Sequence, residues 1–368
     1  MLFRFSFKEI HAYLTKSHGY FDVIIFKSEF FGRGKEIVKN SDFTQGLIAV
    51  VSKGKRFGRN GMRIISILST FSLTTLWLLL CGFTLSPTLI PAKQILSGGP
   101  PKDGIPALTY PKTETAEAAN HWLNDHDLVL GIVVDGKARA YPIRIMNWHE
   151  IVNDRIGQHA FVLSYCPLCG SGMAFDTNDR FGVSGMLYQS DVLLYDKKTE
   201  SLWSQLMMQA VAGPRAGEKL RQFPIEHSAW VSWKTAHPDT DVLSRHTGYH
   251  RDYSRNPYAG YEDVSGTYFP VYNHDGRLPA KAWVIGLSMD NHHIAWKLDD
   301  LKTTGSHQMQ WRQHKLAIRV QGESVQIRDT ESNRLLPVTR LYWFAWTAFH
   351  PDTELSSDSK YLLEQKGR

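Results

Sequence analysis

The sequence predicts a β-rich α+β fold, in which short strands and a few short helices form two degenerate tandem repeats behind one N-terminal transmembrane or signal segment. Three observations predict it: an apolar run near the N-terminus, strand-like runs separated by Gly, Asp and Asn, and motifs that recur in order. The 368 residues are 42% hydrophobic and 21% charged, as in globular proteins. Three cysteines are too few for a disulfide-framed scaffold, so the chain must bury a core.

Residues 1–63 form a basic N-terminal extension. They carry 12 Lys and Arg against 5 Asp and Glu, whereas the rest of the chain carries 30 against 31. The body is therefore close to neutral, which gives no support for a nucleic-acid-binding face. No nucleotide cofactor is indicated either, because Gly182-x-x-Gly185 lacks the Lys-Ser/Thr of a phosphate loop. The extension contains no motif. If translation started at Met62, the residues before it would belong to a mis-assigned start of the chain.

Residues 64–85 contain no charged side chain and are long enough to cross a hydrocarbon layer of ~30 Å as a helix. Lys and Arg cluster just before this segment, so the positive-inside rule places the N-terminus in the cytoplasm and the following domain in the periplasm. A cleaved signal peptide beginning at Met62 is the alternative. Cys81 is a poor lipid-attachment site because Leu80 precedes it. The membrane is thus an expected partner, and the main domain is expected to be extracytoplasmic.

The remaining chain divides at changes of composition. We expect a Pro/Gly-rich linker at 86–106, a first repeat at 107–243, a connecting loop at 244–270, a second, shortened repeat at 271–353 and a polar tail at 354–368.

Two hairpins begin the two repeats. The strand-like runs 130–134 and 137–141 flank Asp135-Gly136, a preferred two-residue hairpin turn. The segment 284–296 aligns with this hairpin without gaps at an offset of 155 residues, and Thr-Glu-Ser at 199–201 recurs at 330–332. Motifs that recur in the same order indicate a tandem duplication, whose second copy is shorter mainly where the first copy carries its cysteines.

A third recurring motif pairs tryptophans with a histidine. Trp230-x-x-Trp233-x-x-x-His237-Pro-Asp-Thr returns as Trp343-x-x-Trp346-x-x-x-His350-Pro-Asp-Thr. On a helix this spacing puts both tryptophans and the histidine on one face, and the proline ends the helix. Short helices are therefore expected near 143–154, 228–237 and 341–350, with the tryptophans in the core and both histidines structural.

The cysteine motif Cys166-Pro-Leu-Cys169-Gly lies between two strand-like runs. A tight turn between strands is the geometry of a zinc knuckle, in which two thiolates point at one metal. A thioredoxin-like motif would instead open a helix, but Gly170, Ser171 and Gly172 follow at once and disfavour one. A structural disulfide is the third possibility.

Further metal ligands must be His, Met or carboxylate. His149 is the first candidate, since it lies just before the cysteine strand and is absent from the second repeat; Glu150 could accept a hydrogen bond from its other ring nitrogen. Asp176 and His237 are weaker candidates. Asn153 stands where a metalloprotease motif needs its second His, so such a site is not supported.

The stretch 181–205 is the longest β-patterned region. It offers hydroxyls and carboxylates, but their spacing reveals no nucleophile and base pair. These residues are Ser184, Ser190, Asp191, Asp196 and Glu200.

Several long motifs resemble the bacterial and archaeal family called domain of unknown function 3179. They include SGGPPKDGIPAL, RAYPIRIMNWHEIVND, SYCPLCGSGMAFD and FGVSGMLYQSDVLLYDKKTESLWSQ, and the resemblance covers roughly residues 96–353. Ser164 and Lys197 depart mildly from the usual pattern. The resemblance implies an N-terminal export or anchor segment and no catalytic assignment.

The sequence therefore predicts a membrane-tethered extracytoplasmic protein that holds copper or zinc at Cys166, Cys169 and His149. Two alternatives stay open. One is thiol-disulfide exchange with Cys166 as the catalytic nucleophile, and the other is a non-enzymatic binding module whose cysteines form a structural disulfide.

Overall fold

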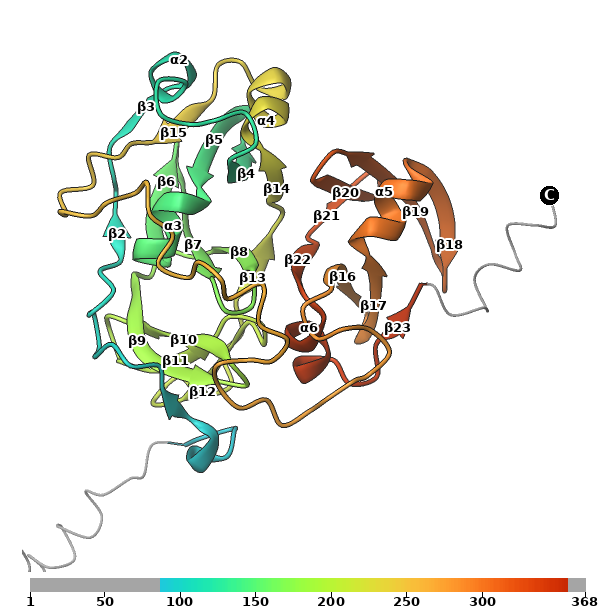
Figure 1. Cartoon of the computed structure of the whole chain (residues 1–368). Coiled ribbons are helices and arrows are strands. Elements are labelled where there is room, and N and C mark those ends of the chain that lie inside the picture. Colours follow the sequence, from blue (N-terminus) through green and yellow to red (C-terminus); the bar gives the residue numbers. More distant parts are fainter. Residues whose placement is uncertain (1–86, 357–368) are drawn as a thin grey trace, which may run out of the picture. The chain divides into compact units, whose positions relative to one another are not determined.

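The computed structural model describes residues 87–356, so the predictions for 1–86 and 357–368 lie outside the described residues. Within this range the fold is β-rich with few, short helices, as the sequence predicts (Figure 1). The α-helices are α2 (Ala116–Ala119), α3 (Ile143–His149), α4 (Trp230–Ala236), α5 (Leu298–Thr304) and α6 (Trp343–Phe349), and a 3-10 turn covers Ala92–Gln94. Of the helices in residues 87–356, none is both long and apolar enough to cross a bilayer.

The described strands form five sheets. Sheet A contains, in spatial order, β1 (Leu96–Ser97), β9 (Phe181–Tyr188), β10 (Asp191–Asp196), β11 (Leu202–Ser204) and β12 (Gln209–Ala212). Sheet B contains β13 (Arg221–Phe223), β8 (Ser171–Asp176), β7 (His159–Cys166), β6 (Ile151–Ile156) and β2 (Leu108–Thr109). Sheet C contains β14 (Glu226–Ala229), β4 (Leu128–Val134), β5 (Lys137–Pro142), β15 (Asp241–Leu243) and β3 (Thr113–Thr115).

Sheets D and E follow in the last third of the described chain. Sheet D contains β22 (Thr339–Tyr342), β16 (Trp283–Met289), β17 (His292–Lys297) and β23 (Glu354–Leu355), and sheet E contains β18 (His307–Trp311), β19 (His314–Gln321), β20 (Ser324–Asp329) and β21 (Leu335–Leu336). A set of five such sheets suggests a five-bladed β-propeller, rather than the grouping into two tandem repeats expected from the sequence.

Both predicted hairpins are present at the centres of sheets C and D. β4 pairs with β5 across Asp135-Gly136, and β16 pairs with β17 across Asp290-Asn291. All four turn residues have positive φ, between 50° and 76°, as a two-residue turn that matches the strand twist requires. Gly, Asn and Asp adopt this conformation most readily, which explains the turn chemistry of both hairpins.

The recurring tryptophan motif is explained by close packing against glycine. A Cβ on Gly131 of β4 would collide with the indole of Trp233 in α4, and one on Gly286 of β16 would collide with the indole of Trp346 in α6. His237 then packs on Trp233 with ring centroids 4.2 Å apart. The pairing of Gly, Trp and His is therefore a structural unit, and it confirms the core role predicted for the tryptophans.

Four strands of sheet A, β9 to β12, lie in the chain between β8 and β13 of sheet B. The largest apolar core is shared by residues of sheets A, B and D, and it includes Cys166 and Cys169. The cysteine turn is therefore buried where these sheets pack together.

Candidate functional site

The cysteine turn is a tight connection between two antiparallel strands. Cys166 ends β7, Ser171 begins β8, and the N–H of Cys169 donates to the carbonyl of Cys166 at 3.2 Å. Gly170 has a φ of 65°, and a Cβ there would collide with the ring of Trp283, so two constraints favour glycine. This is the strand–turn–strand geometry predicted for a zinc knuckle, and no helix follows the turn.

Asp191 completes a cluster with the two cysteines. Its Oδ1 lies 3.8 Å from the Sγ of Cys169, and the ligand atoms of Cys166, Cys169 and Asp191 all lie within 4.8 Å of one another. All three side chains are buried. In residues 87–356, no other group of three or more His, Cys, Asp or Glu residues comes together closely enough to hold a metal ion.

The Asp191 carboxylate is oriented by sheet A. Its Oδ2 accepts hydrogen bonds from the N–H of Leu206 at 3.1 Å and the hydroxyl of Ser204 at 3.3 Å. Gln189 and Ser190, which form the turn before it, both have positive φ, so the chain reverses sharply just before Asp191 enters β10. One oxygen is thus anchored, and the other faces the thiols.

The electrostatics of the cluster disfavour the charged forms of its acidic side chains. Burial raises the pKa of Asp191 to about 7, and burial with the adjacent Cys166 raises the pKa of the Cys169 thiol well above its ordinary value. Negative charge here is costly because little solvent screens it. A cation that displaced the protons would relieve that cost.

His149 lies elsewhere, at the end of α3. Its Nδ1 is 2.7 Å from the carbonyl of Pro106, and its Nε2 is 2.6 Å from the hydroxyl of Tyr253. Burial lowers its pKa. The structure therefore does not bring His149 to the cysteines. Asp191 lies beside the two thiols, where the sequence predicts His149.

The other predicted ligands also lie away from the thiol cluster. Asp176 forms an ion pair with Arg221 at the end of β8, and His237 stacks on Trp233 at the end of α4. Glu150 accepts a hydrogen bond from the hydroxyl of Tyr258 at 2.9 Å rather than from His149, and burial raises its pKa to about 7.

The residues around His149 hold the segment that connects β15 to β16. This connecting segment, residues 244–282, contains no helix or strand. Four consecutive residues, three at the end of α3 and one just beyond the helix, form hydrogen bonds to the connecting segment through their side chains. The pairs are Asn147 with Asn256, Trp148 with the carbonyl of Arg255, His149 with Tyr253, and Glu150 with Tyr258.

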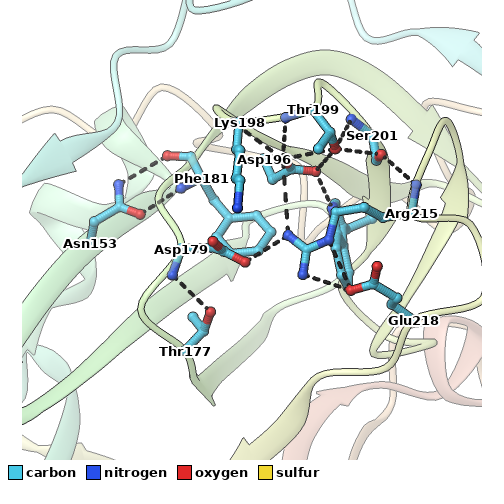
Figure 2. Close-up of polar contacts among 11 residues, drawn as sticks. Asn153, Thr177, Asp179, Phe181, Asp196, Lys198, Thr199, Ser201, Arg215 and Glu218 are labelled. Atoms are coloured by element: carbon cyan, nitrogen blue, oxygen red, sulfur yellow. Dashed lines mark hydrogen bonds and ion pairs between the residues drawn. The ribbon is translucent and has the colours of Figure 1, made fainter.

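Asp196, the next carboxylate in β10, is the centre of a separate polar network (Figure 2). It accepts hydrogen bonds from the N–H of Thr199 at 2.6 Å and the indole of Trp203 at 3.0 Å, and Arg215 lies 4.0 Å away. Burial acts to raise the pKa of Asp196, but these hydrogen bonds and the charge of Arg215 outweigh it and hold the pKa below its ordinary value. Arg215 also pairs with Asp179 at 2.6 Å. A carboxylate so fully bonded stabilises the turn from β10 to β11.

Comparison with known proteins found one family and no individual relative. Neither the curated proteins nor the solved structures contain a match to this chain. The family model described as "Protein of unknown function (DUF3179)" matches residues 102–334, a span that contains the cysteine turn, Asp191 and the whole connecting segment. The chain belongs to the DUF3179 family.

Proposed function

We propose that this protein is a zinc-binding protein whose metal is held by the thiolates of Cys166 and Cys169 and by the carboxylate of Asp191. The observation that carries the proposal is the convergence of these three buried ligand atoms within 4.8 Å. Ligands at zinc bond lengths of 2.0 to 2.3 Å in a tetrahedron are separated by roughly 3.3 to 3.8 Å. The 3.8 Å between Cys169 Sγ and Asp191 Oδ1 is close to that separation.

The mixed donor set favours zinc over copper. Cu(I) selects soft thiolate and thioether ligands, whereas carboxylate oxygen is a harder donor. Zinc accepts both kinds together, and three protein ligands plus an exchangeable fourth are typical of its reactive sites.

Burial supports metal binding over thiol-disulfide exchange. A reactive thiol needs access and a lowered pKa. Cys166 is 1% exposed and Cys169 is fully buried with a raised pKa. Both cysteines are free thiols, which also gives no support to a structural disulfide.

We further propose that the first repeat, which contains the cysteines, and the second repeat arose by duplication of one ancestral unit. The strand order β14-β4-β5-β15 in sheet C matches β22-β16-β17-β23 in sheet D, and the last pair is parallel in both. Sheets B and E would then correspond, and β9 to β12 with Asp191 would be an addition to the first copy.

The expected location of the site is extracytoplasmic. The uncharged segment 64–85 and the positive charges before it support a membrane tether, or a signal for export, ahead of the domain. In that compartment, zinc bound to both thiolates would protect them from oxidation.

The test is elemental analysis of the full chain, purified in detergent and equilibrated with zinc and copper. We expect about one equivalent of zinc, lost in the Cys166→Ser/Cys169→Ser double variant and weakened in Asp191→Asn. Cys81→Ser is the matched cysteine control, and His149→Gln tests the ligand predicted from sequence; both should keep the metal. Absence of metal together with turnover of a disulfide substrate would instead establish the redox alternative, and copper in place of zinc would refute the donor-set argument.

A further inference from the structure

The connecting segment brings a tyrosine cluster to the cysteines. Tyr261 is 1% exposed and belongs to the same apolar core as Cys166 and Cys169. Its ring lies edge-on to Tyr268, with centroids 4.6 Å apart. Ser190 joins this part of the segment to the thiols, because its carbonyl accepts from the Sγ of Cys169 at 3.4 Å and its hydroxyl donates to the carbonyl of Phe269 at 2.8 Å.

The hydroxyl of Tyr261 differs from those of its neighbours because it has no hydrogen-bond partner among residues 87–356. The hydroxyl of Tyr258 donates to Glu150 at 2.9 Å, and that of Tyr342 donates to Glu262 at 2.9 Å. A buried hydroxyl without a partner is uncommon and calls for a specific reason. A ligand that arrives at the thiol cluster would supply the missing partner.

The chain around Tyr261 fixes its position. Lys281 donates hydrogen bonds to the carbonyls of Tyr261 and Val264, and its ammonium lies 3.5 Å from the centroid of the Tyr261 ring. These contacts hold the ring in place.

We propose that Tyr261 is the residue that recognises an exchangeable small anion at the fourth position of the metal. This inference rests on the proposed zinc site, in which three protein ligands leave one position for an outside ligand. The phenol stays protonated, donates its hydrogen to the anion, and leaves the metal itself to Cys166, Cys169 and Asp191. The ligand class is a compact anion with an oxygen or nitrogen acceptor, such as hydroxide, a carboxylate or azide.

The experiment uses cobalt as a visible substitute for zinc and azide as the probe. The full chain is loaded with cobalt, and azide is titrated while the visible absorption of the metal is recorded. Tyr261→Phe removes only the hydroxyl. Tyr268→Phe is the matched control, because it removes a hydroxyl from the neighbouring ring and keeps the ring contact.

We expect cobalt to bind all three proteins with equal stoichiometry and with the thiolate-to-metal absorption of the wild type. Azide should bind about tenfold or more weakly to Tyr261→Phe than to the wild type and to Tyr268→Phe, as expected for loss of one hydrogen bond to a charged group. Equal azide affinity in Tyr261→Phe and the wild type would overturn the assignment.

Two other outcomes separate this inference from the zinc site on which it rests. If cobalt does not bind the wild type at Cys166 and Cys169, the metal site itself is refuted. If cobalt binds the wild type and is lost from a folded Tyr261→Phe protein, the phenol is a metal ligand and the role as anion donor is overturned. Thermal denaturation of each metal-free variant establishes that it is folded.

Discussion

Replacing Asp191 by Asn should strengthen the metal-free fold at alkaline pH while it weakens binding of the proposed zinc. Burial raises the pKa of Asp191 to about 7 from an ordinary 3.8. Since the folded pKa is the higher one, the stability that the neutral carboxyl contributes is present below pH 3.8 and is lost as the pH rises toward 7. The difference corresponds to about 4 kcal/mol at pH 8, at 1.36 kcal/mol for each pKa unit. Asn keeps an acceptor for Leu206 and carries no charge.

The assay is urea denaturation of chelator-treated protein at pH 5 and pH 8. Asp191→Asn should gain up to about 4 kcal/mol over the wild type at pH 8 and clearly less at pH 5. Glu150→Gln is the matched control: burial also raises the pKa of Glu150 to about 7, so this variant should gain up to about 3 kcal/mol at pH 8 and keep its zinc. An Asp191→Asn protein that is no more stable than the wild type at pH 8 would refute the reasoning.

Three further predictions concern packing, acid stability and the connecting segment. Gly286→Ala should cost about 1 to 3 kcal/mol in urea denaturation because its Cβ would strike Trp346, whereas Gly266→Ala, with nothing near it, should be close to neutral. Burial lowers the pKa of His350 to about 3, so the free energy of unfolding should be highest above pH 6.5 and should fall as the pH drops toward 3. In urea denaturation at a series of pH values, His350→Gln should show a smaller decline than the wild type. His149→Gln should keep the metal but speed proteolysis within the connecting segment, since it disturbs the bond to Tyr253; an unchanged cleavage rate would show that this bond does not hold the segment.

The hairpins, the tryptophan helices and the cysteine turn could all be predicted because each is a local pattern. Asp135-Gly136 specifies a turn by its own backbone preferences, and the spacing of Trp343 and Trp346 specifies one helix face. The strand–turn–strand geometry at Cys166 likewise follows from the glycines after it. Such features depend on neighbours within a few residues.

The third member of the buried cluster, Asp191, could not be predicted in this way. His149 is nearer to the cysteines in the chain, but α3 directs it to Pro106 and Tyr253. Asp191 reaches the thiols only because β9 and β10 pair and sheet A packs on sheet B, which is a tertiary outcome. The available signal was a carboxylate that directly follows a Gln-Ser turn and begins an apolar strand, but four other polar side chains in 181–205 looked equally suitable.

The position of the connecting segment has a consequence for the order of events during biosynthesis. The cysteine turn leaves the ribosome first, Asp191 follows, and the tyrosines of residues 244–282 arrive only after both. An early chain therefore presents two open thiols, and a later one has them enclosed. The proposed zinc would be loaded most easily in the interval between these stages, so a supply of zinc during synthesis would govern how much of the protein matures with its thiols intact.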